Sequence, residues 1–381
     1  MGKPVRPHAV PQGEGEVSFS PERTRDAIRS AAPGRFLLWL LSLVYSGAIE
    51  VRRRLYAAGM LPSSRLPVPV ICFGNISAGG TGKTSTVIAA ARELKQLGFK
   101  PAILLRGYGR KAPPRKLVLL DGPGEYDAAE CGDEAVIIHN ALKDLSIPVS
   151  VSADRAAAGR AAVEKLGCDI LLMDDGFQHF ALKRDRDIVI VNAAAPFHKD
   201  APLPLGNLRE RKAGLARAHM VIISHCERST AAGLEELHAE IKKINPRAVV
   251  AESMHVPEHF IDARRRLPVP LATVKGKAAS VISAIGDPDS FERNLRELGA
   301  GLEGIWRYPD HHRFTVEEIK ALAAASGDRP VITTYKDFSR FPPSWETILR
   351  GPLYILSVRI TFLCDGYRLM MDQLIPPGTS S

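Results

Sequence analysis

The residues best suited to chemistry in this sequence are Lys83 and Thr84, which end a glycine-rich turn. The turn, GGTGKT at residues 79–84, follows an apolar run over 68–73 and precedes a helix predicted from Ser85 to Leu97. Glycines let a backbone curl round phosphate groups, and a helix N-terminus attracts them with its N–H groups and dipole. A lysine at this position reaches the β- and γ-phosphates, and the following hydroxyl holds Mg²⁺. The segment therefore predicts a phosphate-binding loop for a nucleoside triphosphate.

The predicted loop departs from the usual motif at one position. The motif has a glycine five residues before Gly82, where this chain has Ser77. The alternative interpretation is a glycine-rich turn that binds nothing, but the flanking strand and helix patterns favour phosphate binding. The residues predicted to contact the nucleotide are Ser77, Ala78, Gly79, Gly80, Thr81, Gly82, Lys83 and Thr84.

A second signal for nucleotide chemistry lies about 90 residues further along the chain. The apolar run at residues 170–173 ends in two acids, Asp174 and Asp175. An acid at the end of such a strand stands beside the magnesium ion in P-loop enzymes. Many buried strands end in aspartate, so the pattern gains its weight from the phosphate loop that precedes it. We therefore predict that Asp174 holds Mg²⁺ together with Thr84.

Other polar turns are expected at the same edge of the sheet, because the carboxyl ends of parallel strands face the ligand crevice. Arg106 opens a basic glycine turn, and a polar loop at residues 204–210 follows a later strand. Asp133 and Glu134 precede a helix predicted from residue 135. For these two acids the alternative is an ordinary pair at a helix N-terminus, where the dipole favours negative charge.

Composition limits the class of protein and its surroundings. The chain has 381 residues, which favours two domains, and a formal net charge of +9, which needs an anionic partner or surface. Basic residues are scattered except near the N-terminus, which favours a membrane face over nucleic acid. Five widely spaced cysteines form no CxxC pair, so neither a disulfide framework nor a zinc site is indicated, and a reducing cytoplasm is expected.

The N-terminal region changes character near residue 35. Residues 1–34 are rich in proline, glycine and charge and are predicted to be a flexible extension, followed by a membrane-associated helix over 35–58. The apolar run at 36–49 is about 21 Å long at 1.5 Å per residue, shorter than a ~30 Å hydrocarbon core. Arginines at 52–54 follow it and fit a helix dipped into one leaflet better than a signal peptide. A buried core helix is the alternative.

Alternating strand and helix patterns predict an α/β fold with a doubly wound, mostly parallel sheet. We expect a P-loop domain over residues 59–248 and 363–381. A second, smaller α/β domain is expected over 263–351, joined by a two-stranded β-ribbon at 249–262 and 352–362.

Several short segments recur together in one family. They are RGYG at 106–109, GDE at 132–134, ADR at 153–155, DDGFQH at 174–179, LRE at 208–210, PDHH at 309–312 and TTYKD at 333–337. With the phosphate loop and the apolar helix they resemble the tetraacyldisaccharide 4′-kinase family of lipid A synthesis, over about residues 35–376. The chain departs from that pattern at Ser85, Asn207, Asp287 and Tyr335.

The resemblance implies an ATP-dependent kinase that phosphorylates the 4′-hydroxyl of tetraacyldisaccharide 1-phosphate to give lipid IVA. It implies ATP and Mg²⁺ as cofactors, and the lipid A disaccharide 1-phosphate and the inner-membrane surface as partners. It implies neither nucleic acid nor an obligate protein partner. The expected location is the cytoplasmic face of the bacterial inner membrane, held peripherally or monotopically by the N-terminal helix.

Roles follow for the residues that match the family's motifs. Lys83 is expected to hold the phosphates, and Thr84 and Asp174 the metal, with Glu134 or Glu210 completing its shell. The resemblance implies Asp133 as general base for the sugar hydroxyl, and His311 is expected to assist it. For His311 the alternative is a surface turn, and for His179 a packed histidine. The further candidates are Asp175, Gln178, His179, Arg106 and Arg209.

Two other functions stay open from the sequence. One is a membrane-attached P-loop GTPase or ATPase switch, which would prefer GTP or respond to a protein partner. The segment Thr334 to Asp337 is similar to segments that recognise the guanine base in such proteins. A soluble ligase or small-molecule kinase would stay fully active and detached from membranes after Leu38, Trp39 and Leu41 are changed to Ser. The lipid kinase predicts ATP preference and almost no turnover without its lipid acceptor.

Overall fold

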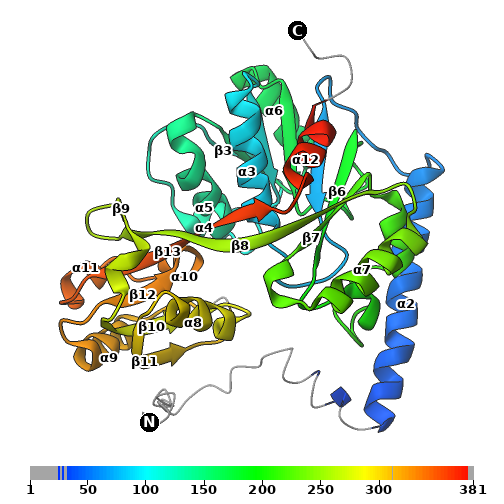
Figure 1. The fold of residues 1–381 in the computed structure, drawn as a ribbon. Helices are drawn as coiled ribbons and strands as arrows, with labels where there is room; N and C mark the ends of the chain where they lie inside the picture. The colour runs from blue at the N-terminus through cyan, green and yellow to red at the C-terminus, as the bar shows by residue number, and fades with distance from the viewer. Residues whose placement is uncertain (1–24, 26–27, 30–31, 311, 376–381) are drawn as a thin grey trace. The chain divides into compact units, whose positions relative to one another are not determined.

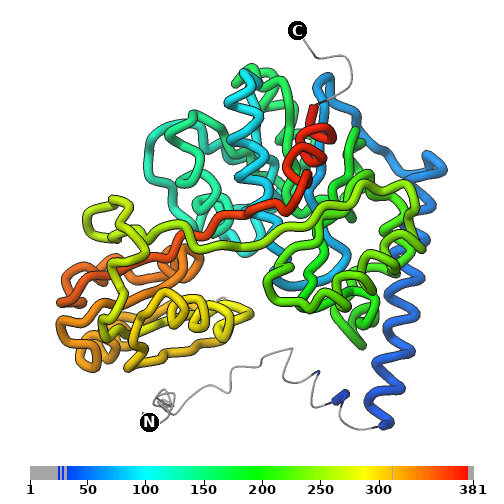
Figure 2. Tube along the Cα trace, in the orientation of Figure 1, coloured from blue at the N-terminus to red at the C-terminus, as the bar shows by residue number. Residues whose placement is uncertain are grey.

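The computed structural model describes residues 25, 28–29, 32–310 and 312–375, and it divides into two compact units (Figures 1 and 2). The larger unit runs to His255 and resumes at Ile360, and the smaller unit comprises Val256–Arg359. The predicted flexible extension lies mostly outside the described residues.

The larger unit is built on a parallel sheet in the order β3-β4-β2-β5-β1-β6-β7-β8, of which only the β3–β4 pairing is antiparallel. Its strands are β1 (Val70–Gly74), β2 (Pro101–Leu105), β3 (Val118–Leu120), β4 (Val149–Val151), β5 (Ile170–Asp174), β6 (Arg186–Asn192), β7 (Met220–Ser224) and the first part of β8 (Val249–Asp262). The phosphate-loop strand β1 lies between β5, which carries the tandem acids, and β6.

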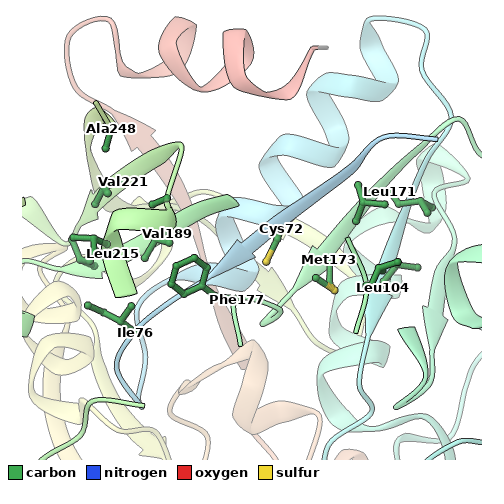
Figure 3. Close-up of a cluster of buried hydrophobic side chains, with 14 of the residues drawn as sticks. Cys72, Ile76, Leu104, Leu171, Met173, Phe177, Val189, Leu215, Val221 and Ala248 are labelled. Carbon is green, nitrogen blue, oxygen red and sulfur yellow. The ribbon is translucent and has the colours of Figure 1, made fainter. Parts of the chain in front are cut away.

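Both faces of this sheet are covered, which explains its continuous apolar strands. Successive side chains of β1 point to opposite faces, so Val70 and Cys72 belong to one core and Ile71 and Phe73 to the other. The first core, part of which Figure 3 shows around Phe177, also receives helices α6 (Arg155–Leu166) and α7 (Ala231–Ile244). The second receives α3 (Lys83–Gln96), α5 (Asp133–Leu142) and α12 (Gly366–Leu374).

Helix α2 (Ala32–Ala57) is longer than the apolar run in the sequence suggests. Its 26 residues extend about 39 Å at 1.5 Å per residue. By length and composition alone it is able to cross a membrane, and little of it is buried in the protein. The helix is therefore no ordinary core helix, and its length reaches that of a bilayer core.

The smaller unit has its own parallel sheet, in the order β11-β10-β12-β13. Its strands are β10 (Ala278–Ser283), β11 (Gly301–Arg307), β12 (Val331–Thr334) and β13 (Leu353–Phe362), with β9 (Leu267–Val269) paired to β8. Helices α8 (Pro288–Glu297) and α9 (Val316–Ser326) contribute to separate cores, and short helices α10 (Tyr335–Phe338) and α11 (Trp345–Ile348) follow.

Two long strands connect the units. β8 begins in the larger unit and ends in the smaller one, β13 runs the other way, and the two are neighbours in the strand order. The predicted fold class is confirmed, including the parallel P-loop sheet and the two-stranded ribbon. Strand β8 has the bounds expected for the first ribbon strand, 249–262, whereas helix α5 starts at Asp133, where the sequence predicted residue 135.

Candidate nucleotide and magnesium site

The glycine-rich turn joins β1 to α3 and leaves the helix N-terminus uncapped. Gly79 and Gly82 have φ values of 107° and 78°, a left-handed backbone that glycine adopts without strain. Gly82 is the N-cap of α3, and no side chain there bonds to the first N–H groups of the helix. These amide donors and the positive end of the helix dipole are therefore available to an anion. Lys83 is the first residue of the helix.

Neighbouring strand ends hold the turn in place. The Ser224 hydroxyl at the end of β7 donates to the Thr81 carbonyl at 2.8 Å, and the Asn192 amide at the end of β6 donates to the Gly80 carbonyl at 3.2 Å. The Asn75 amide lies 3.3 Å from the Thr81 hydroxyl. Sequence reasoning missed these residues, although for Asn192 a polar residue at the end of β6, the strand adjacent to β1, was a usable signal.

Thr84 and Asp174 meet where the sequence predicted a metal site. The Thr84 hydroxyl lies 3.3 Å from Oδ2 of Asp174, which ends β5. Asp174 is buried, and its Oδ1 has no hydrogen-bond partner among the described residues. Burial, with a smaller contribution from Glu134, raises the pKa of Asp174 to about 7. A buried carboxylate oxygen with no partner, beside a threonine hydroxyl, fits the oxygen ligands that Mg²⁺ prefers.

Asp175 joins the site through its charge. Its carboxylate accepts two hydrogen bonds from Arg209, at 2.7 and 2.8 Å, and lies 3.6 Å from the Lys83 ammonium. Burial opposes ionisation of Asp175, but Lys83 and Arg209 outweigh it and hold the pKa of this carboxyl below its usual value. The second acid of the tandem therefore holds the side chains of Lys83 and Arg209 beside the phosphate loop.

Glu210 has partners of a different kind from those predicted. Its buried carboxylate pairs with Arg217 at 2.8 Å and accepts a hydrogen bond from Gln178 at 2.8 Å. The Gln178 amide also donates to the Asn75 carbonyl at 2.8 Å, and the Arg217 guanidinium lies over the Phe177 ring at 4.3 Å. Both oxygens of Glu210 are thus engaged, and the residue fixes the loop after β5. Nothing in the sequence pointed to Arg217.

Asp133 and Glu134 begin helix α5, beside the basic turn that contains Arg106. Gly132 precedes them with φ 96°, and a Cβ there would lie 3.3 Å from the Tyr108 carbonyl. The charge of Glu134 reaches Asp174, because it contributes to the raised pKa of that residue. The structure thus brings Glu134, Asp174 and Lys83 to one edge of the sheet, as the sequence predicted.

His179 and Arg155 lie behind this edge. The buried Arg155 guanidinium donates to the Ser152 carbonyl at 2.8 Å and the Asp174 carbonyl at 3.4 Å, and burial lowers its pKa to about 10. Burial, with the charges of Arg155 and Arg184, lowers the pKa of His179 to about 4. Arg155 therefore supports the end of β5, and His179 is neutral at pH 7.

The smaller unit contains the remaining predicted residue, His311, which lies outside the described residues. Its neighbour Asp310 accepts a hydrogen bond from Lys336 at 2.9 Å. His312 pairs with Glu318 at 2.9 Å and stacks on the Tyr308 ring at 4.7 Å.

The uncapped glycine loop, Lys83 and the Thr84–Asp174 pair at the edge of a parallel sheet define a P-loop nucleotide-binding protein. The family model described as tetraacyldisaccharide-1-P 4′-kinase matches residues 34–375. Tetraacyldisaccharide 4′-kinase of Elusimicrobium minutum is 41% identical over 338 residues, which cover 88% of this chain and 90% of that protein. The corresponding protein of Anaeromyxobacter dehalogenans strain 2CP-C is 39% identical over 340 residues, covering 88% and 89%.

A solved structure agrees with these relatives. The crystal structure of LpxK from Aquifex aeolicus in complex with ATP matches with a TM-score of 0.68 and 27% identity, over 90% of this chain and 99% of that one. The chain belongs to the tetraacyldisaccharide-1-P 4′-kinase family. The resemblance expected from the sequence is confirmed, and the switch-protein alternative is not favoured.

Proposed function

We propose that this chain transfers the γ-phosphoryl group of ATP to the 4′-hydroxyl of tetraacyldisaccharide 1-phosphate, giving lipid IVA. The observation that carries the proposal is the Thr84–Asp174 pair beside an uncapped phosphate loop, in a member of this kinase family. Membership of the family supports the choice of the lipid acceptor. The geometry of the larger unit supports the binding of the phosphoryl donor.

On the donor side, the loop amides and Lys83 bind the β- and γ-phosphates. Thr84 and Asp174 hold Mg²⁺, with Glu134 close enough to contribute directly or through water. Bound Mg²⁺ neutralises charge on the phosphate oxygens. Phosphoryl transfer depends mainly on such positioning and charge neutralisation, so these side chains carry most of the rate acceleration.

On the acceptor side, Asp133 accepts the proton of the sugar hydroxyl. It begins α5 next to the basic turn whose exposed tip is Tyr108. Arg110 stiffens that turn, because its guanidinium donates to the carbonyls of Pro113, Pro114 and Lys116. Arg106 in the same turn contacts a phosphate of either substrate. His311 stays the predicted assistant of this base.

Helix α2 brings the enzyme to its substrate at the cytoplasmic face of the inner membrane. Seven large apolar side chains of its first half each leave 42–65% of their surface exposed. They are Phe36, Leu37, Trp39, Leu40, Leu41, Leu43 and Val44. The charges of Arg209 and Glu210 reach Tyr45 of the same helix, so its middle lies near the nucleotide site. An acylated disaccharide stays in the bilayer, and this helix places the site at that surface.

The test is acceptor-dependent transfer. Purified protein is incubated with γ-labelled ATP or GTP and disaccharide 1-phosphate in detergent micelles, and the label is traced to the lipid. We expect label at the 4′ position, preference for ATP and almost no hydrolysis without lipid. Rapid nucleotide hydrolysis that ignores the lipid, or label on another acceptor only, would contradict the proposal. Changing Phe36, Leu40 and Val44 to Ser should reduce activity on vesicles more than on micelles.

A further inference from the structure

Three metal-ligating side chains gather in the larger unit, away from Thr84 and Asp174. His225 follows β7, Glu227 lies in the short helix η4 (Cys226–Arg228), and His255 lies in β8. One ligand atom of each residue lies within 4.8 Å of the others. The lipid kinase chemistry proposed above uses none of them.

The three side chains are already organised around one another. Nδ1 of His225 lies 3.2 Å from Oε1 of Glu227, and the backbone N–H of His255 is 3.4 Å from Oε2 of Glu227. The imidazole rings of His225 and His255 stack, with centroids 4.2 Å apart and planes 17° from parallel. The carboxylate therefore contacts the imidazole of His225 and the backbone of His255.

The polar atoms of His255 lack partners. Both of its ring nitrogens are buried and make no hydrogen bond to any described residue. A neutral imidazole has one donor and one acceptor, and burying such a group unpaired costs about 1–3 kcal/mol. Buried groups of this kind call for a ligand, and the ligand atoms of a second histidine and a carboxylate lie within 4.8 Å of His255.

We propose that His225, Glu227 and His255 bind one divalent ion of the zinc class, with the fourth position open to water. Two imidazoles and a carboxylate suit Zn²⁺ and neighbouring late transition metals, whereas Mg²⁺ prefers oxygen ligands alone. Ligands of a tetrahedral Zn²⁺ lie roughly 3.3 Å apart, given bonds of about 2.0 Å. The ligand atoms lie within 4.8 Å of one another, so binding draws them together by up to about 1.5 Å. The side chains of His225 and Glu227 are 18% and 31% exposed, and rotation of these two side chains supplies that shift.

The site adjoins the phosphate loop. A Cβ on Gly82 would lie 2.5 Å from Cε1 of His255, so the imidazole ring packs directly against the N-cap of α3. An ion on His255 fixes this ring against the loop without occupying the Thr84–Asp174 site. The chain then has two metal sites with different chemistry, one of oxygen ligands for Mg²⁺ and one of nitrogen and oxygen ligands.

The test is metal binding by the full chain after chelator treatment. Zn²⁺ is titrated by calorimetry in excess Mg²⁺, and Co²⁺ is added in its place to read the ligand field from its visible absorption. The variants are His225→Ala, His255→Ala and Glu227→Gln. The matched control is His238→Ala, because His238 pairs with Glu252 at 2.7 Å without a second histidine.

We expect one Zn²⁺ per chain, a Co²⁺ spectrum typical of four-coordination, and at least a roughly 100-fold loss of affinity in either cluster histidine variant. The His225→Ala variant keeps the test valid if His255→Ala disturbs the loop. Binding below one ion per chain, or equal affinity in His225→Ala and His238→Ala, would overturn the inference. Lipid phosphorylation with Mg²⁺ is assayed on the same chelated sample, so a failed kinase assay with intact Zn²⁺ binding rejects the proposed function and leaves this site standing.

Discussion

The two units contain the same strand–turn–helix junction with opposite treatment of the helix N-terminus. In the larger unit β1 leads to α3, whose N-cap is Gly82 and carries no side-chain cap. In the smaller unit β10 leads to α8, whose N-cap Asp287 accepts a hydrogen bond from the Ser290 N–H at 3.3 Å. The first helix end is open to an outside anion, and the second is satisfied by its own side chain.

The acidic side chains at the strand ends of the two sheets also differ in their surroundings. In the larger unit Asp174 keeps a buried oxygen without a partner, next to Thr84. In the smaller unit Asp337 is also buried beside a threonine, and the Thr334 hydroxyl donates to its Oδ2 at 2.8 Å. Its Oδ1 makes no hydrogen bond to a described residue either, but it lies 3.8 Å from the buried guanidinium of Arg340. A fold shared by two units thus does not make both of them nucleotide sites, because the free backbone donors and the charges at the strand ends decide which edge binds.

The strongest challenge to this comparison is Lys83→Ala. The ammonium group is the one positive side chain at the start of the open helix, and its loss removes direct charge stabilisation of the transferred group. We expect phosphoryl transfer to fall by on the order of 10³-fold. Steady-state assays with lipid acceptor measure it, and activity within tenfold of wild type would reject the loop as the catalytic site.

Gly82→Ala replaces the glycine N-cap of α3 with a residue that has a Cβ atom. Alanine must adopt φ near 78°, and its Cβ would meet the His255 ring at 2.5 Å. The strain and displacement should weaken ATP binding by about 10- to 100-fold. Calorimetric titration with ATP measures the effect, and Gly276→Ala, at φ 70° with open space around it, is the matched control for backbone strain alone.

His179, beside the edge of the larger unit's sheet, makes the stability of the folded chain depend on pH. His179 has its pKa lowered to about 4 by burial and neighbouring arginines, against about 6.5 in the unfolded chain. Between these values the unfolded chain binds more protons, so His179 makes the folded state lose stability as pH falls from 6.5 to 4. His179→Gln should remove on the order of 2 kcal/mol of that loss, after allowance for solvent screening. Urea unfolding at several pH values measures it, and an unchanged slope would contradict the buried neutral state.

Asp287→Ala opens the helix end that the smaller unit keeps closed. Losing a side-chain N-cap costs about 1 kcal/mol of unfolding free energy. Asp287→Asn keeps an accepting oxygen and should restore most of the stability. ATP affinity should not change in either variant, and a tenfold loss of affinity would show that the contrast between the two helix ends is wrong.

Local patterns in the sequence predicted the fold and the donor half of the site. Glycines at 79–82 before Lys83, and an apolar strand ending in Asp174, are short-range signals whose chemistry needs few other contacts. The helix predicted over 35–58 is also present, and it begins three residues earlier, at Ala32, and ends at Ala57.

The rest of the site depends on side chains that the fold brings together over long sequence distances. Glu210 was predicted as a metal ligand, but Gln178 and Arg217 occupy its oxygens, and no pattern in the sequence announces that pairing. Asn192 and Ser224 support the loop from strands far along the chain. The cluster of His225, Glu227 and His255 likewise exists only because β7 and β8 are neighbours in the sheet.

The account depends most on Asp174 and the open end of α3 binding a magnesium–triphosphate together. The direct measurement is ATP affinity by calorimetry, with and without Mg²⁺, in wild type and Asp174→Asn, without lipid acceptor. The account predicts that Mg²⁺ tightens ATP binding in wild type and that Asp174→Asn loses most of this gain while its affinity without Mg²⁺ stays near that of wild type. An equal effect of Mg²⁺ on both proteins would contradict it.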